Sequence, residues 1–310
     1  MAITASMVKE LRELTGAGMM DCKKALNETD GDMDKAVEFL REKGLATAQK
    51  KAGRVAAEGI CKTLVSDDKK KAVIVEVNAE TDFVAKNDTF QGYVAQVAEQ
   101  AMETSAADVE AFLAETWKFD TTKTVQEALA GQIAIIGENM NIRRFEQVCE
   151  DNGFIGSYTH MGGKIGVLID VQTDVVNEAI EEMARNVAMQ VAAIKPMYTS
   201  RDEVSQEYIE HEKEILAAQA RNEKPDADEK IINGMVMGRI NKELKEICLL
   251  DQVYVKAEDG KQTVAQYVAE VAKANNANVV VKKFVRFETG EGIEKKEEDF
   301  AAEVAKQMGM

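Results

Sequence analysis

The stretch VIVEVNAETDFVAKN (residues 73–87) marks a change from strand-like to helix-like sequence. Its first five residues are mostly β-branched, which is typical of a strand. Apolar residues then recur at helical spacing, which predicts a helix: Phe90, Val94, Val97, Ala98 and Ala101. The segment Thr81-Asp82-Phe83-Val84 is therefore predicted to lie on the turn between strand and helix. Thr81 or Asp82 can cap a helical turn, because their side-chain oxygens accept hydrogen bonds from free backbone N–H groups. Capping does not account for the aromatic Phe83.

A second stretch, VLIDVQTDVV (residues 167–176), repeats this pattern. Each copy follows another strand-like run, ICKTLV (60–65) in the first and GFIGSYTH (153–160) in the second, so each predicts a hairpin. A helix is predicted from Val175 to Ile194. We interpret the two regions as an internal duplication of a strand–strand–helix unit. Aligning the two Thr-Asp pairs places Val175 where the first copy has Phe83, so capping needs no aromatic residue there.

The N-terminal region has helical periodicity throughout. Three short helices are predicted, the first capped by Thr4, the second from about Met19 to Asn27, and the third from near Asp32 to just before Gly44. They form a small bundle similar to ubiquitin-associated domains. The Ala- and Lys-rich residues 45–59 are predicted to be a helical linker between this bundle and the rest of the chain.

The chain after Pro196 turns helical again. Residues 202–222 and 229–247 each carry a thin apolar stripe, which predicts a projecting antiparallel hairpin of two helices. The segment then predicts, in order, a short strand QVYV (252–255), a helix (263–274), a strand (278–287), a turn TGEGIE (289–294) and an amphipathic C-terminal helix (297–308).

These elements predict an α+β fold with a duplicated antiparallel sheet-plus-helix core. The predicted division is a three-helix domain (1–53), a first core half (54–152), a second core half (153–200 and 247–288), a helical hairpin insertion (201–246) and a C-terminal module (289–310).

Composition limits the class of protein. The net charge of −16 argues against nucleic-acid binding, because neutralising phosphates requires a basic surface. The four cysteines, Cys22, Cys61, Cys149 and Cys248, lack metal-ligand spacing, which indicates reduced thiols. The N-terminus has no apolar segment typical of a signal peptide, and no run is long enough to span a membrane. We therefore expect a cytoplasmic protein without a membrane partner.

No catalytic constellation is found in the sequence. The only two histidines, His160 and His211, have no neighbouring nucleophile or metal ligand. The run HMGGKIG (160–166) fails as a phosphate loop, because Tyr158 stands where the first glycine is required and Ile165 where Ser or Thr is required. The carboxylates lie on predicted exposed helix faces. The sequence therefore favours a binding function without a cofactor, a metal or an enzymatic activity.

Two long motifs resemble the signature stretches of the bacterial elongation factor Ts family: LRELTGAGMMDCKKAL (11–26) and EVNAETDFVAK (76–86). GSYTHMGGKIGVLI (156–169) is similar to the second core half of that family, and residues 284–305 to its C-terminal end. The resemblance implies a guanine-nucleotide exchange factor for elongation factor Tu, the GTPase that delivers aminoacyl-tRNA. It implies that Thr81, Asp82, Phe83 and Val84 intrude near the Mg²⁺ site of that GTPase, with Phe83 wedged between two of its helices.

The same resemblance implies further contacts with the partner. The N-terminal bundle would hold a helix of the GTPase through Met19 and Met20, although both could instead belong to the core of the bundle. His160 would face the partner, and the tail around Phe300 and Val304 would dock on the GTPase or back on the core.

Two alternatives remain from the residues alone. The first is a non-catalytic adaptor of the ubiquitin-associated type, or a chaperone-like binding protein, that uses the N-terminal bundle. The second is an enzyme with dispersed carboxylates, which the absence of clustered His, Cys or Gly-rich loops disfavours.

Overall fold

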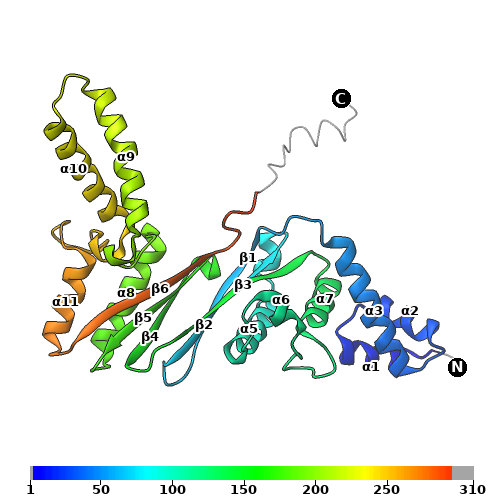
Figure 1. The fold of residues 1–310 in the computed structure, drawn as a ribbon. Coiled ribbons are helices and arrows are strands. Elements are labelled where there is room, and N and C mark those ends of the chain that lie inside the picture. The colour runs from blue at the N-terminus through cyan, green and yellow to red at the C-terminus, as the bar shows by residue number, and fades with distance from the viewer. Residues whose placement is uncertain (1–2, 295–310) are drawn as a thin grey trace.

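The computed structural model describes residues 3–294 of the 310 residues (Figure 1). The described residues form helices together with two three-stranded antiparallel sheets, which is consistent with the predicted α+β class. The predicted C-terminal helix, with Phe300 and Val304, lies outside the described residues. Within residues 3–294, no helix is both long enough and apolar enough to cross a membrane.

The N-terminal region forms three helices, α1 (Ala5–Thr15), α2 (Met19–Glu28) and α3 (Met33–Lys51). Thr4 caps α1 as predicted, since its hydroxyl accepts a hydrogen bond from the N–H of Met7. The helices share a small core whose fully buried side chains are Leu11, Cys22, Ala25, Leu26 and Ala36. The similarity of this bundle to ubiquitin-associated domains stays a prediction.

The prediction of a third helix ending before Gly44 and a separate linker was wrong. Helix α3 continues through Gly44 to Lys51, because its second half packs on α7 (Val125–Ile136) of the first core half. Gly44 is buried close to Ala130, and Arg41 forms an ion pair of 2.5 Å with Glu127. One helix therefore belongs to both the bundle and the core.

The first core half contains a sheet of order β1-β2-β3, made of β1 (Glu58–Val65), β2 (Lys71–Ala79) and β3 (Met140–Cys149). Between β2 and β3 the chain forms α4 (Asp82–Ala85), α5 (Asp88–Glu103), α6 (Val109–Ala114) and α7. The five residues predicted for the inner face of the helix after the turn all lie in the core that α5 forms against the sheet.

The second core half repeats this arrangement with β4 (Gly153–His160), β5 (Ile165–Thr173) and β6 (Val279–Glu288). The 3₁₀ turn η1 (Met161–Gly163) joins β4 to β5, and α8 (Glu178–Ile194) and α11 (Val264–Ala274) contribute to the core of this half. The predicted short strand QVYV is not formed. A 3₁₀ turn, η3 (Leu249–Asp251), precedes it, and Val253 makes only an isolated bridge with Thr263.

The structure supports the duplication but corrects its alignment. In each sheet the pairing of the central strand is interrupted by a bulge at the same place, between Glu76 and Val77 in β2 and between Asp170 and Val171 in β5. This register aligns Ala79 with Thr173, and the connection from there to the cap of the following helix is four residues longer in the first half.

The predicted cap of the second helix was also wrong. Helix α8 begins at Glu178 rather than Val175, and Asn177 caps it by accepting a hydrogen bond from the N–H of Ile180. Asp174 instead binds the backbone N–H of Asn278. Val175 packs at the edge of the second core and is not equivalent to Phe83.

The hairpin insertion projects from the second half as α9 (Gln206–Glu223) and α10 (Glu229–Ile247) (Figure 1). A short 3₁₀ turn, η2 (Arg201–Glu203), precedes α9, where the sequence predicted continuous helix. The predicted apolar stripe forms a core of its own, with buried residues Val204, Ala220, Ile232, Val236, Ile240, Leu244 and Cys248.

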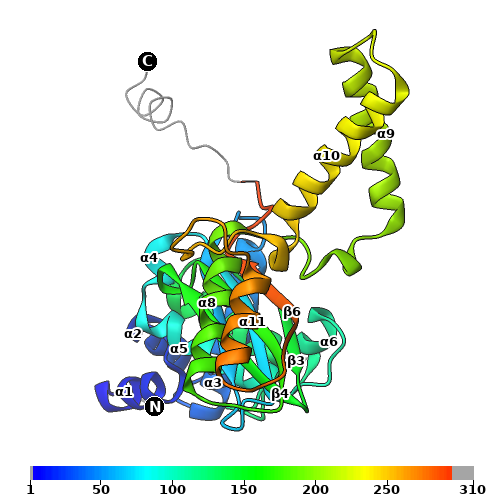
Figure 2. The ribbon, with the colours of Figure 1, turned by 90° about the vertical axis from the view of Figure 1, so that its left-hand side faces the viewer.

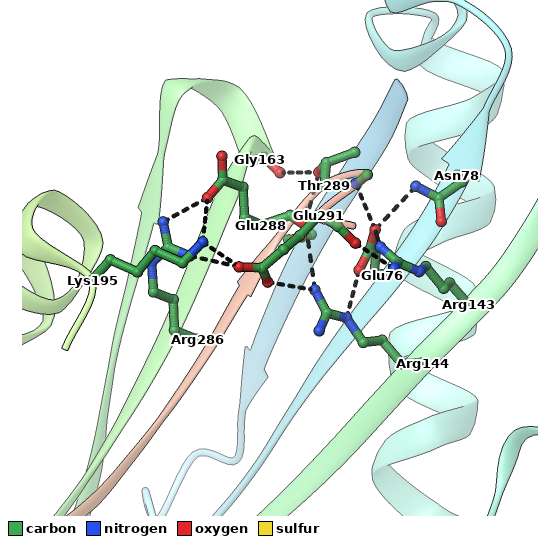
Figure 3. Close-up of polar contacts among 12 residues, drawn as sticks. Glu76, Asn78, Arg143, Arg144, Gly163, Lys195, Arg286, Glu288, Thr289 and Glu291 are labelled. Atoms are coloured by element: carbon green, nitrogen blue, oxygen red, sulfur yellow. Dashed lines mark hydrogen bonds and ion pairs between the residues drawn. The ribbon is translucent and has the colours of Figure 1, made fainter. Parts of the chain in front are cut away.

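The two sheets pack against each other through one face each. Alternate residues of β2 and β5 face this junction, including Ile74 and Leu168, while the opposite faces are covered by α5 and α8. Glu76 also faces the junction and is fully buried. Its carboxylate accepts hydrogen bonds from Arg143 (3.0 Å) and Arg144 (2.6 Å), so its charge is paired (Figure 3).

The segment after β6 crosses back to the first sheet at this ion cluster (Figure 3). The backbone N–H of Gly290 donates to Glu76 at 2.8 Å, and Arg144 also binds Glu291. Gly290 has a φ of 72°, and a Cβ there would lie 2.1 Å from the carbonyl oxygen of Ala57, so only glycine fits. The cluster therefore ties the end of the second half to the first.

Candidate functional site

The Thr81–Val84 turn forms a one-turn helix, α4, of its own. The Thr81 hydroxyl caps it by accepting a hydrogen bond from the N–H of Val84 at 3.3 Å. The next helix, α5, has a separate cap in Asn87. Eight positions separate the end of β2 at Ala79 from Asn87, whereas four separate the end of β5 at Thr173 from Asn177. The longer connection of the first half supplies this additional helical turn.

The two faces of α4 differ. Val84 and Ala85 are half-buried and pack on the core of the first half. Phe83 lies on the opposite side and is 81% exposed. Within α4, Phe83 is the one exposed side chain, since Asp82, Val84 and Ala85 are all half-buried. The turn therefore displays one aromatic side chain from an anchored backbone.

Asp82 is ionised on the same turn. A hydrogen bond from Lys86, with the two charged atoms 2.7 Å apart, holds the pKa of Asp82 below its ordinary value. The charges of Lys86 and of Lys164 act in the same direction. Because Lys164 comes from the η1–β5 connection, the second half contributes to the electrostatics of the turn.

His160 lies at the end of β4, next to η1, and is exposed. Its Nδ1 lies 2.9 Å from the hydroxyl of Tyr158. The adjacent Met161 is 71% exposed, and Gly163 packs against Ile60 of β1. Lys164 lies 3.5 Å from Glu58 at the start of β1. The η1 turn and α4 are thus both placed at the same end of β1.

Met19 and Met20 are both exposed, at 58% and 74%. The possibility that they form the core of the bundle was wrong, because Cys22, Ala25 and Leu26 supply the buried face of α2. Leu14 in α1 is also largely exposed. Figure 2 shows α2 and α4 on the same side of the molecule, with the hairpin projecting away from that side. The two helices that carry Phe83, Met19 and Met20 therefore lie on one side of the molecule.

Glu138, which the sequence analysis missed, holds the turn in place. It follows α7, and its carboxylate accepts hydrogen bonds from both the N–H (3.0 Å) and the hydroxyl (2.8 Å) of Thr81. No local pattern could have revealed this contact, because the two residues are 57 positions apart.

The His, Cys, Asp and Glu side chains of the described residues do not gather into a metal site. Among residues 3–294 there is no group of three His, Cys, Asp or Glu side chains that could hold a metal ion. Burial raises the pKa of the Cys61 thiol to about 12, which makes it unreactive.

Comparison with known proteins assigns the chain to a family. The model of the family described as "Elongation factor TS" matches residues 80–291. The chain belongs to the elongation factor Ts family. It is 57% identical over 308 residues to elongation factor Ts of Clostridium botulinum (strain Eklund 17B / Type B), covering 99% of both chains. It is 56% identical over 308 residues to that of Clostridium perfringens (strain 13 / Type A), and 55% identical over 306 residues to that of Clostridioides difficile (strain 630), again over 99% of each chain.

Membership of the elongation factor Ts family confirms the resemblance seen in the two sequence motifs. The second of these motifs, around residues 76–86, contains the turn that displays Phe83, and the first contains the exposed Met19 and Met20.

Proposed function

We propose that this protein is the guanine-nucleotide exchange factor for elongation factor Tu in translation elongation, acting in the cytoplasm. Its family supports this function, and the exposure of Phe83 on an anchored turn is the observation that carries the mechanism. It needs no catalytic group of its own, because exchange depends on binding alone.

Exchange follows from the linkage between two ligands of one GTPase. An exchange protein binds the nucleotide-free GTPase more tightly than the GDP-bound GTPase. Its binding therefore weakens the binding of GDP, and GDP weakens the binding of the exchange protein to the same extent. GDP is held largely by phosphate contacts and by Mg²⁺, so a disturbance near the metal is an effective way to release it. In this proposal Thr81, Asp82, Phe83 and Val84 enter that region, and the Phe83 ring separates two helices of the GTPase.

The remaining contacts hold the protein on its partner while the turn acts. The bundle of residues 1–53 would contact the GTPase through Met19 and Met20, whose flexible side chains suit an adaptable interface. His160 would contact it from the second half. In this proposal the contacts of Met19, Met20 and His160 supply affinity, and the Thr81–Val84 turn acts on the nucleotide site.

Release of fluorescent GDP from purified elongation factor Tu tests the proposal. We expect the protein to accelerate release at substoichiometric concentration in the presence of excess unlabelled nucleotide. A protein that binds elongation factor Tu without changing the release rate would instead be an adaptor. A protein that does not bind it at all would contradict the proposal entirely.

A further inference from the structure

The carboxylate of Glu138 makes two hydrogen bonds to the residue that caps the Phe83 turn. One oxygen accepts from the Thr81 N–H at 3.0 Å and the other from the Thr81 hydroxyl at 2.8 Å. Bonds to a charged acceptor are stronger than those to a neutral one. Glu138 is only partly exposed, so solvent competes less for these bonds than at the open surface.

This contact also determines how Thr81 caps α4. A hydroxyl has one proton and two lone pairs. Since the proton points at Glu138, a lone pair is left to accept the N–H of Val84 at 3.3 Å. The three groups therefore form a chain of hydrogen bonds that runs from Glu138 to the helical turn carrying Phe83.

A reciprocal contact lies beside it. Glu80 accepts a hydrogen bond from the backbone N–H of Asn139 at 2.5 Å, while the Asn139 side chain donates to the carbonyl of Arg54 at 2.7 Å. The pairs Glu80–Asn139 and Thr81–Glu138 thus join the two connections, one after β2 and one before β3, at two neighbouring points.

An isolated single turn cannot fix its own conformation. Nucleating a helix is unfavourable, and α4 has four residues, with only Val84 and Ala85 anchored in the core. An aromatic wedge is effective only if its position is set before binding, since ordering it on contact would reduce the binding free energy.

We propose that Glu138 is a positioning residue for nucleotide exchange, which fixes the Thr81 cap and so preorganises Phe83. The proposal rests on the exchange function proposed above. Glu138 itself need not touch the GTPase.

The test compares Glu138→Ala, Phe83→Ala and the double variant in the GDP-release assay. We expect Glu138→Ala to lower the maximal release rate about threefold to tenfold, with little change in the concentration of elongation factor Tu that gives half the maximal rate. In the Phe83→Ala background, Glu138→Ala should have no further effect, because its contribution acts through the ring.

Glu115→Ala is the matched control. Glu115 makes the same kind of contact elsewhere in the first half, accepting hydrogen bonds from the Thr104 hydroxyl and the Gln100 amide. Its loss should reduce stability to a similar degree and leave exchange near wild type. Should Glu138→Ala fold poorly, Glu138→Gln keeps the size of the side chain but leaves one acceptor oxygen for two donors of Thr81, and it should also lower the release rate.

Hydrogen exchange of the free protein separates the two proposals. The Thr81 amide should lose protection in Glu138→Ala and keep it in Glu115→Ala. A wild-type protein that fails to release GDP would overturn the proposed function, whatever the amide data show. Two results would overturn the positioning role alone. One is a Glu138→Ala protein that releases GDP at the wild-type rate, and the other is a double variant that releases GDP more slowly than Phe83→Ala.

Discussion

At the scale of single residues, Phe83 offers the most direct prediction. A buried phenylalanine replaced by alanine costs about 3–5 kcal/mol of stability, but Phe83 is 81% exposed. We expect Phe83→Ala to change the free energy of unfolding by no more than about 0.5 kcal/mol. The loss of an aromatic contact in the complex should instead lower the catalytic efficiency of GDP release about tenfold to a hundredfold. Thermal melting and the release assay measure the two effects separately.

The control for this variant must also be an exposed apolar residue. Val175 is unsuitable, because it packs on the second core rather than matching Phe83. Met237 on α10 is 48% exposed and lies on the hairpin, so Met237→Ala should leave both stability and release unchanged. Early melting of Phe83→Ala, or normal release by it, would contradict the wedge mechanism.

Asp170 occupies the place in the second half that Glu76 occupies in the first, but it lacks the paired arginines. It is buried between the sheets near Glu150, whose carboxylate is bound by Lys282 at 2.9 Å. Burial, and then the neighbouring Glu150, raises the pKa of Asp170 to about 6. Burial acts against ionisation of Glu150 as well, but hydrogen bonds from Lys282 and the Asn152 N–H outweigh it and lower the pKa of Glu150.

Asp170→Asn should therefore stabilise the protein near neutral pH. The unfolded chain releases this proton near pH 3.9 and the folded chain near pH 6, so the folded state binds more protons between them. The stability that Asp170 contributes is thus complete below pH 4 and is lost as the pH rises through 6. Asparagine does not ionise. As the pH rises from 4 to 7, the free energy of unfolding of Asp170→Asn should therefore rise above that of wild type, by on the order of 2–3 kcal/mol at pH 7.

Urea unfolding of both proteins across this pH range measures the difference. Asp259→Asn is a control of the opposite kind, because backbone N–H groups of Gln262 and Lys261 lower the pKa of that exposed residue. The difference in free energy of unfolding between Asp259→Asn and wild type should not grow as the pH rises from 4 to 7. A difference that stays constant for Asp170→Asn would show that Asp170 ionises normally in the folded protein.

The residue scale also shows where sequence reasoning reached its limit. The wedge that the family resemblance implies requires an exposed Phe83, and the ring is exposed in the structure, whereas the alignment of Phe83 with Val175 was wrong. Chain order could not reveal Glu138, because its partner Thr81 is distant in sequence and becomes adjacent only when β2 and β3 pair.

At the scale of elements, the hairpin should be separable from exchange. Its apolar residues pack on one another, and near its base Tyr208 donates a hydrogen bond of 2.6 Å to Glu243. Replacing residues 211–240 with a short glycine-rich turn keeps that base. We expect the rate of GDP release and the melting temperature to remain close to wild type. This corresponds to changes of no more than about 0.5 kcal/mol in the activation free energy of release and in the free energy of unfolding. Loss of release at unchanged stability would show that the arm contacts the GTPase.

The elements themselves were predictable where the signal is local. Hairpins, the thin stripe of the arm and the inner face of α5 all follow from periodicity within one segment. The end of α3 was not predictable, since Gly44 usually weakens a helix. Here packing on α7 and the Arg41–Glu127 ion pair carry the helix past it.

At the scale of the whole molecule, α3 connects the bundle to the Phe83 turn. Its last residue, Lys51, donates a hydrogen bond to the carbonyl of Gly137, directly before Glu138, and the carbonyl of Arg54 binds Asn139. Removing the bundle therefore also removes a support of the contact that fixes Thr81. Residues 1–53 are therefore joined to the first core half by packing of α3 on α7, and not only by a linker.

Two truncations distinguish the roles of the bundle. Deleting residues 1–32 removes Met19 and Met20 but keeps α3 on α7, whereas deleting residues 1–53 removes α3 as well. Both should raise the concentration of elongation factor Tu required for half-maximal release. Only the longer deletion should also lower the melting temperature and the maximal rate, because it uncovers α7 and frees the Gly137–Glu138 connection. The two truncated proteins could instead have the same melting temperature and the same maximal release rate. In that case α3 acts only as part of the bundle, and Glu138 fixes the turn without support from α3.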